Sequence, residues 1–275
     1  YDMSASLVGS EMCIRDSRLC YTHPIRLSHP LNTAAAPGLQ RGEYMTRKIE
    51  VTDYRPEWES MFKEEAKKIK KILGKNCIGI YHIGSTSVKN MASKPIIDIM
   101  PVVKDLSLVD AHNKEFESLG YECRGEFGIP GRRFYAKGGD NRTHHIHIFE
   151  QSNQTDIQRH IAVRDYLNSH PDTAAEYAAL KKKLATEFPF DNDGYCNGKE
   201  KYMKSLEEKA LHWQEKQNRL SMGIALGLCF GVAIGTSFDT LYNNTGIGMI
   251  FGAAIGLMFG MVFGSMDKTD RSRQK

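Results

Sequence analysis

The sequence predicts an α+β domain, in which helices pack on a mixed β-sheet, followed by a two-helix transmembrane hairpin. Three observations divide the 275 residues in this way. Residues 45–218 combine short apolar runs with amphipathic helical patterns. Residues 219–275 hold ten of the 24 glycines and two long uncharged runs. Residues 1–44 follow neither pattern, so we treat the chain as three segments.

The composition excludes several classes of protein. The chain has 37 Lys and Arg against 33 Asp and Glu, and a net charge of +4 spread this evenly gives no indication of nucleic-acid binding. The six cysteines form no C-x-x-C pair, so a metal knuckle or a thioredoxin-type site has no support, and reduced cytoplasmic thiols are expected. A hydrophobic content of 41% excludes a wholly disordered chain.

Residues 1–44 have no helical or alternating period and lack the apolar run that a signal peptide requires. The stretch Ser4–Ser17 resembles a translated sequencing-library adaptor. We therefore expect a non-native leader and a translation start at Met45, with a genuine disordered leader as the alternative. The mass of the N-terminal peptide from the natural host tests this expectation.

The middle segment, 45–218, is long enough for one domain with its own core. An amphipathic helix is expected from Pro56 until Gly74 stops the pattern. Apolar and β-branched runs predict strands, and longer periodic runs predict helices. The predicted strands cover 77–83, 96–103, 133–137 and 144–150, and the later helices cover 108–119, 156–169, 171–188 and 198–216. In this segment the predicted strands come first and in the middle, and three helices follow them, an order that predicts a mixed sheet covered by helices.

A polar turn between the first two strands is the sharpest local feature. Gly84 and Ser85 leave one strand, and small hydroxyl residues after a glycine can surround a phosphate. Asp98 lies in an otherwise apolar strand, and a buried carboxylate needs a partner, a proton or a metal. Taken alone, the same residues also fit an ordinary turn and a structural hydrogen bond.

Several motifs in one order resemble the GrpB family across about 49–211. They are His82-Ile-Gly-Ser-Thr-Ser87, Lys94-Pro-Ile-Ile-Asp-Ile99, Arg132-Arg-Phe134, Thr143-His-His-Ile-His-Ile148, Arg164-Asp-Tyr-Leu167 with His170-Pro171, Tyr177–Ala185, and Tyr195 with Gly198-Lys199. The resemblance implies a nucleotidyltransferase-like fold. That superfamily has a Gly-Ser turn and two carboxylates on the next strand, which hold metal ions that orient a triphosphate.

The match to the transferase pattern is incomplete. Gly84 and Ser85 correspond to the phosphate-binding pair and Asp98 to the first carboxylate, which makes Asp98 the candidate catalytic residue. Met100 occupies the position of the second carboxylate, and Met does not bind Mg²⁺. Nucleotidyl transfer therefore stays open, and the resemblance itself implies no established activity.

Two histidines offer another ligand set. Strand alternation places His145 and His147 on one face of the sheet, with Ile146 and Ile148 on the other. Together with Asp98 they could bind a divalent metal, either Mg²⁺ or a transition metal, or they could line a polar cleft and contact a ligand's phosphates. The candidate phosphate-binding residues are Gly84, Ser85, Thr86, Ser87, Lys94, Arg132, Arg133, His145, His147 and Lys199. We expect Lys181, Lys182 and Lys183 to form a solvated helix face.

The C-terminal segment, 219–275, predicts the hairpin. Residues 220–238 and 246–266 carry no charge, and each run can cross a hydrocarbon core of about 30 Å as a helix. Glycines recur every fourth residue, at Gly223, Gly227, Gly231 and Gly235 and then at Gly248, Gly252, Gly256, Gly260 and Gly264. This tail resembles glycine-zipper membrane segments of bacterial proteins, which implies helix packing or homo-oligomer formation.

The flanking charges predict the topology. Lys216 and Arg219 precede the first span, basic residues from Lys268 onward follow the second, and the connecting loop carries only Asp239. The positive-inside rule therefore places both termini and the GrpB-like domain in the cytoplasm, with the hairpin in the cell membrane.

Two functional hypotheses follow. The first is a membrane-anchored domain that binds a nucleotide or another phosphorylated metabolite and could be a nucleotidyltransferase with a degenerate acidic motif. The second is a non-catalytic binding or scaffold module that the glycine hairpin oligomerises. Met100 favours the second hypothesis, and the number of intact polar motifs favours the first.

Overall fold

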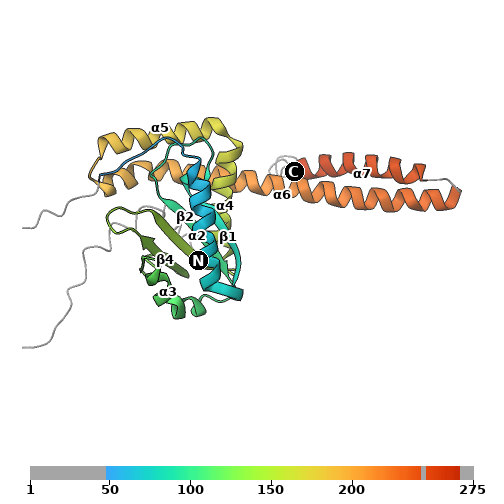
Figure 1. Ribbon diagram of the computed structural model, residues 1–275. Helices are drawn as coiled ribbons and strands as arrows, with labels where there is room; N and C mark the ends of the chain where they lie inside the picture. The colour runs from blue at the N-terminus through green and yellow to red at the C-terminus, as the bar shows by residue number, and fades with distance from the viewer. Residues whose placement is uncertain (1–47, 243–245, 267–275) are drawn as a thin grey trace, which may run out of the picture. The chain divides into compact units, whose positions relative to one another are not determined.

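The computed structural model describes residues 48–242 and 246–266 (Figure 1). The expected leader and start at Met45, and the basic residues from Lys268 onward, lie outside the described residues. The chain forms two compact units, Tyr1–Glu207 and Glu208–Lys275, which we describe separately.

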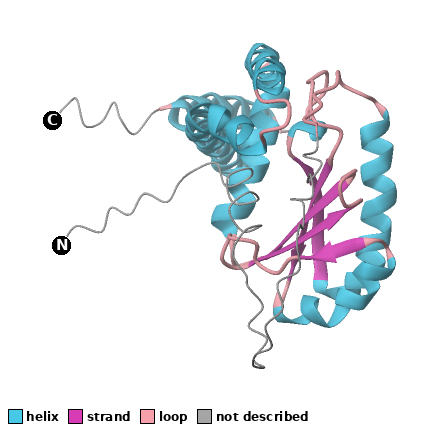
Figure 2. Cartoon of the chain, turned by 90° about the vertical axis from the view of Figure 1, so that its left-hand side faces the viewer, coloured by secondary structure: helices cyan, strands magenta, loops and turns pink. Residues whose placement is uncertain are grey.

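The first unit contains the predicted mixed β-sheet, drawn in magenta in Figure 2. Its strand order is β1-β2-β5-β4-β3. The parallel pair β2–β5 lies at the centre of the sheet, and the other neighbours are antiparallel. The strands are β1 Cys77–Ile83, β2 Ile97–Val103, β3 Tyr121–Cys123, β4 Arg132–Lys137 and β5 His144–Glu150.

Helices cover both faces of this sheet. The α-helices are α2 Glu57–Leu73, α3 Asn113–Ser118, α4 Gln154–Ser169, α5 Pro171–Glu187, α6 Asn192–Tyr242 and α7 Ile247–Ser265, and the 3₁₀ turns are η1 Gly74–Asn76, η2 Ser85–Ser87 and η3 Ser107–His112. Helices α4 and α5 follow β5 directly, so the second half of the domain is helical, as the order of patterns predicts.

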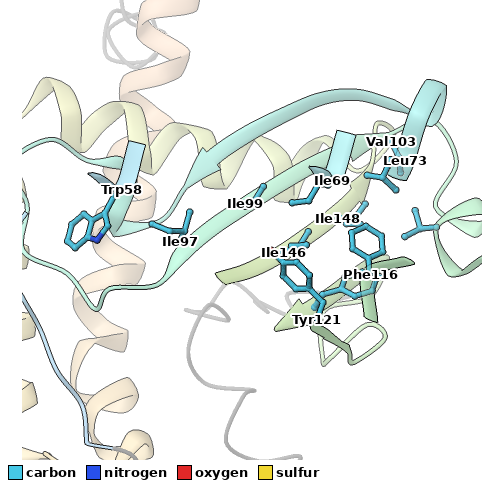
Figure 3. Packing of buried hydrophobic residues seen from close by; sticks show 12 residues of the cluster. Trp58, Ile69, Leu73, Ile97, Ile99, Val103, Phe116, Tyr121, Ile146 and Ile148 are labelled. Atoms are coloured by element: carbon cyan, nitrogen blue, oxygen red, sulfur yellow. The ribbon is translucent and has the colours of Figure 1, made fainter. Parts of the chain in front are cut away.

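Strand alternation places one apolar cluster on each face of the sheet. On one face Ile97, Ile99, Ile146 and Ile148 pack with residues of α2 and α3, among them Trp58, Ile69, Leu73 and Phe116 (Figure 3). On the other face Met100, Ile83 and Phe149 pack with Ile157 of α4. Since successive side chains alternate, Asp98, His145 and His147 share the face of α4.

Three element predictions needed correction. The helix expected at 108–119 consists of η3 followed by the short α3, and the three-residue strand β3 was missed because three residues show no period. The helix expected at 198–216 and the first span are parts of one helix, α6, because no proline interrupts the sequence between them.

In the second unit the two glycine ladders face each other. A Cβ atom on Gly227 would meet the backbone of Gly256, and one on Gly231 would meet that of Gly252, so the backbones of α6 and α7 touch where side chains are absent. Large apolar side chains occupy the outer surface, among them Phe230, Phe251 and Phe263, which are exposed. Both helices are long and apolar enough to cross a membrane.

The aspartate near the turn closes this hairpin. Asp239 Oδ1 accepts a hydrogen bond from the Gly248 N–H at 2.7 Å, and Oδ2 accepts one from the Met249 N–H at 2.9 Å. These N–H groups belong to the first turn of α7, where backbone donors lack partners within the helix. The carboxylate therefore caps α7 from the end of α6.

Candidate functional site

A cavity of about 500 Å³ opens on the α4 face of the first unit. Its walls come from the turn after β1, from β2 and β5, from α4 and α5, and from the start of α6. Of the residues predicted from sequence, Gly84, Ser85, Lys94, Asp98, Arg132, His145, His147 and Lys199 line it. The fold thus gathers residues separated by more than a hundred positions around one space.

Asp98 lines the cavity and contacts two histidines of β5. The parallel register of β2 and β5 pairs Asp98 with His145, whose Nδ1 lies 3.3 Å from Asp98 Oδ1. His147 follows two residues later on the same face, with Nε2 3.6 Å from that oxygen. One carboxylate oxygen thus faces two imidazoles.

The electrostatics favour an ionised carboxylate. Burial would raise the pKa of Asp98, but the hydrogen bond from His145 and the close contact with His147 together outweigh burial and hold the pKa well below its usual range. Burial lowers the pKa of His147 to about 4, despite the attraction of Asp98. At neutral pH the pair therefore consists of a charged Asp98 and a neutral His147.

Gly84 permits this arrangement. It has φ +69° and ψ −171°, a combination that essentially only glycine adopts, and a Cβ atom there would collide with Asp98 Oδ2. The glycine is required both for the backbone turn and for the space that the carboxylate occupies.

The hydroxyl groups of Thr86 and Ser87 hold the turn itself. Thr86 Oγ1 donates to the Ile96 carbonyl at 3.2 Å and lies 3.1 Å from His82 Nε2, and Ser87 Oγ donates to the Gly84 carbonyl at 2.6 Å. Neither residue lines the cavity. Of the predicted hydroxyl ligands, only Ser85 reaches it.

The two neighbouring arginines of β4 point to opposite faces. Arg132 is buried and donates to the carbonyls of Glu126 and Phe127 and to His147 Nδ1 at 3.3 Å. Arg133 forms a bidentate ion pair with Asp110, at 2.6 and 2.8 Å, and does not line the cavity. Arg132 therefore positions His147, whereas Arg133 pairs with Asp110 on the opposite face of the sheet.

The Asp98, His145 and His147 side chains meet one requirement of a metal centre, since one ligand atom from each lies within 4.8 Å of the others. Two nitrogens and one oxygen suit a transition metal better than Mg²⁺. Met100, two residues after Asp98 on β2, is fully buried in the apolar cluster that includes Ile157 of α4.

Arg132 imposes a condition on such a metal. A guanidinium only donates, so His147 Nδ1 accepts its hydrogen bond and Nε2 carries the proton of the neutral ring. Coordination through Nε2 requires the proton to move to Nδ1, which in turn requires Arg132 to withdraw. A metal at this site would compete with the Arg132–His147 contact.

Comparisons with known proteins identify the family of the domain that carries this cavity. The model of the GrpB protein family matches residues 48–209, more than half of the chain. The chain belongs to the GrpB family. A second family model, the glycine zipper membrane protein, matches residues 214–266. The chain therefore joins a GrpB domain to a glycine-zipper membrane region.

Three relatives place the GrpB domain among known proteins. UPF0157 protein YqkA of Bacillus subtilis is 43% identical over 181 residues, which are 66% of this chain and 52% of YqkA, so the chain spans about half of that relative. Glutamate-rich protein GrpB of Alkalihalophilus pseudofirmus is 32% identical, over a match that covers 62% of this chain and 97% of the length of that protein. The crystal structure of conserved protein GrpB from Enterococcus faecalis has a TM-score of 0.58 and 45% identity, and covers 60% of this chain and 99% of that one.

The cavity wall also contains residues that were not predicted to belong to the site, among them Lys181 and His160. Lys181 is 2% exposed and lines the cavity, so the prediction of a solvated face was wrong for this lysine. A signal was present, because Tyr177, Lys181 and Leu184 recur at the spacing of one helix face, and all three are buried. The exposed neighbour Lys182 pairs with Asp53.

His160 of α4 is another cavity residue that had no sequence signal beyond its type. Its Nδ1 donates to the Asp156 carbonyl at 2.7 Å, which leaves a lone pair on Nε2, and that buried atom has no hydrogen-bond partner among the described residues. Burial, assisted by the charge of Arg159, lowers the pKa of His160 to about 3. The ring is therefore a neutral acceptor at the cavity wall.

Proposed function

We propose that this protein is a membrane-anchored GrpB domain that binds a nucleotide or another phosphorylated small molecule in the cavity on the α4 face. The supporting observation is the set of buried cationic side chains in the cavity wall, namely Arg132, Lys181 and Lys199, which are 2%, 2% and 7% exposed. Phosphate groups carry negative charge in a form that lysine and arginine bind well, and the contact is strongest where water is excluded.

The shape of the cavity supports a small-molecule ligand. Its volume of about 500 Å³ falls within the range of roughly 300–1,000 Å³ that such ligands occupy. The turn at Gly84 and Ser85 brings backbone and hydroxyl groups to one wall, and Asp98 with His145 adds acceptors at another. A ligand with both phosphate and hydroxyl groups matches these walls.

Whether the bound molecule reacts depends on Asp98. In the first alternative a metal held by Asp98, His145 and His147 supports nucleotidyl transfer. In the second the domain only binds, and the apolar packing of Met100 at the second carboxylate position favours this alternative. Incubation with a nucleoside triphosphate labelled at its α-phosphate separates the two, since only the first releases pyrophosphate or labels an acceptor.

We propose further that the hairpin anchors the domain on the cytoplasmic face of the cell membrane. Lys216 and Arg219 precede the first span, while Asp239 lies near the turn. A reporter fused after Lys275 should be active on the cytoplasmic side. Activity only on the outer side would refute this topology.

A thermal-shift panel tests the binding proposal. The full chain, purified in detergent, is heated with nucleotides, sugar phosphates and divalent metals, alone and in pairs, and the panel is repeated with Asp98→Ala. A ligand at a hundredfold its Kd should stabilise the protein by about 2.7 kcal/mol. Stabilisation that survives Asp98→Ala would remove Asp98 from the site, and no shift with any phosphorylated compound would refute the proposal.

A further inference from the structure

Asp98 is a largely buried carboxylate whose contacts are with histidines. Its side chain is 19% exposed, and it lies against the imidazoles of His145 and His147. Among the residues that the structure describes, it forms no ion pair with a lysine or an arginine. A buried carboxylate is unfavourable unless an opposite charge or a metal compensates it. A divalent cation would supply the charge that the side chains around Asp98 do not.

The separations around Asp98 fit a single ion. Asp98 Oδ1 lies 3.3 Å from His145 Nδ1 and 3.6 Å from His147 Nε2, and one ligand atom from each of the three side chains lies within 4.8 Å of the others. Ligand atoms about 2.1 Å from one tetrahedral ion are roughly 3.4 Å apart. Both contacts of Asp98 already match this spacing, so an ion between the three side chains requires only small side-chain movements.

The fold holds these three side chains in place. The parallel register of β2 and β5 at the centre of the sheet pairs Asp98 with His145. The Phe134 ring of β4 lies beside both imidazoles, with centroids 5.3 Å from that of His145 and 5.1 Å from that of His147. Ligands on strands are positioned more precisely than ligands on loops. The site is therefore largely formed before an ion arrives.

The protons on the two imidazoles must move when an ion binds. His145 Nε2 is buried and has no hydrogen-bond partner among the described residues, so it can carry the proton that Nδ1 gives up. His147 can carry its proton on Nδ1 once Arg132 withdraws. That Arg132 contact, at 3.3 Å, is longer than the two that Arg132 makes with backbone carbonyls, at 3.2 and 2.7 Å. Its loss leaves the two carbonyl contacts in place.

We propose that Asp98, His145 and His147 bind a divalent transition-metal ion, such as Zn²⁺, in preference to Mg²⁺. Two imidazole nitrogens and one carboxylate oxygen are a ligand set that such ions accept, whereas Mg²⁺ takes oxygen ligands. Three protein ligands leave at least one coordination position for water or for an oxygen of a molecule in the cavity that all three residues line. The inference goes beyond the proposed function, because the ion needs no phosphorylated molecule in order to bind.

Calorimetric titration of the full chain in detergent, without an affinity tag, tests the site with Zn²⁺ alone and with Mg²⁺ alone. We expect Zn²⁺ to bind at least a hundredfold more tightly than Mg²⁺. Asp98→Asn and His145→Gln should each weaken Zn²⁺ binding at least tenfold. His144→Gln is the matched control and should leave Zn²⁺ binding within twofold. His144 belongs to the same strand and also has a buried Nε2 without a hydrogen-bond partner among the described residues, but alternation places it on the opposite face of the sheet.

Co²⁺ provides a second probe, because its visible absorption depends on the type and geometry of its ligands. The spectrum of the Co²⁺-loaded chain should change in His147→Gln, should stay the same in His144→Gln, and should disappear when Zn²⁺ is added. A spectrum that is the same in the unchanged protein and in both variants would place the ion elsewhere and refute the site.

The outcomes separate this inference from the proposed function. Equal affinity for Zn²⁺ and Mg²⁺, or Zn²⁺ binding that survives both Asp98→Asn and His145→Gln, would overturn the metal site. If a substitution lowers the unfolding temperature, the comparison of the two ions on the unchanged protein still decides. Zn²⁺ binding without binding of any phosphorylated compound would uphold the metal site and refute the proposed function, and the reverse result would do the opposite.

Discussion

The substitution Gly84→Ala tests whether the turn and Asp98 form one unit. The added methyl group has two consequences. It forces a non-glycine residue into a backbone conformation of φ +69° and ψ −171°, and it collides with Asp98 Oδ2. The carboxylate must then move away from His145 and His147, which lie 3.3 and 3.6 Å from its other oxygen.

The two consequences differ in size and can be separated. A residue in such a backbone region costs of the order of 1–3 kcal/mol. Loss of a hydrogen bond to a charged group adds about 1.5–3 kcal/mol. Gly74 provides the control, because it has φ +54° and ψ −130° and a Cβ atom there would have nothing within 4 Å, so alanine at this position carries only the backbone cost.

Thermal unfolding of the full chain in detergent measures the difference. For a domain of this size 1 kcal/mol corresponds to about 2–4 °C in Tm, so Gly84→Ala should unfold about 3–12 °C below Gly74→Ala. Gly84→Ala should also weaken binding of phosphorylated ligands, and Gly74→Ala should not. Equal Tm values for the two variants would refute the coupling between Gly84 and Asp98.

Three further predictions concern stability. Burial raises the pKa of Glu65, but the hydrogen bonds from Lys137 and Lys68 and the charge of Lys137 together outweigh burial and lower the pKa to about 2. The stabilisation that ionised Glu65 contributes is therefore present above pH 4.5 and lost toward pH 2. Glu65→Gln should lower the free energy of unfolding by about 2 kcal/mol at pH 7, allowing for the half-exposed Lys68, and by less at pH 3. A loss of stability in thermal unfolding that is constant with pH would contradict this prediction. Because the pKa of His160 is lowered to about 3, the unfolded state binds a proton first and stability falls as the pH drops below 6.5, by about 2 kcal/mol at pH 5. In urea denaturation, His160→Gln should make the free energy of unfolding depend less steeply on pH. An unchanged pH dependence would count against this role of His160. Asp239→Ala should destabilise the hairpin by about 1–2 kcal/mol in detergent, because it removes the cap of α7, and Asp239→Asn should destabilise it less. Equal stability of the unchanged protein and both variants would show that the cap is dispensable.

The residues of the site could be predicted from sequence better than their arrangement. Asp98 was recognisable as a carboxylate in an apolar strand, and alternation placed His145 and His147 on one face, which the structure confirms. Their meeting depends on the parallel pairing of β2 with β5 across 47 positions, and no local pattern encodes such a pairing.

It was harder to predict from sequence which face of a strand or helix a given side chain occupies. Alternation along β4 implies that only one of Arg132 and Arg133 faces the cavity. Which one does follows from the register with β5, which pairs Arg132 with Phe149 on the α4 face and Arg133 with Ile148 on the other face. Lys181 was misassigned because its charge outweighed its position on the buried face of α5.

The glycine period predicted a groove on each membrane helix without specifying its partner. In the structure Gly227 and Gly231 of α6 pack on Gly256 and Gly252 of α7, within one chain. The same ladders could also have packed on another copy, because a period of four fixes the face and leaves the partner open. The proposed homo-oligomer must therefore use the outer surfaces of the hairpin or an exchange of partners.

Binding of a phosphorylated small molecule by the membrane-anchored chain is the central claim. Calorimetric titration with matched pairs, adenosine triphosphate against adenosine and ribose 5-phosphate against ribose, tests it most directly. We expect at least one phosphorylated member to bind, its unphosphorylated partner to bind at least tenfold more weakly, and Lys199→Met to reduce the difference. Equal affinity within every pair, or no binding of any phosphorylated compound, would contradict the claim.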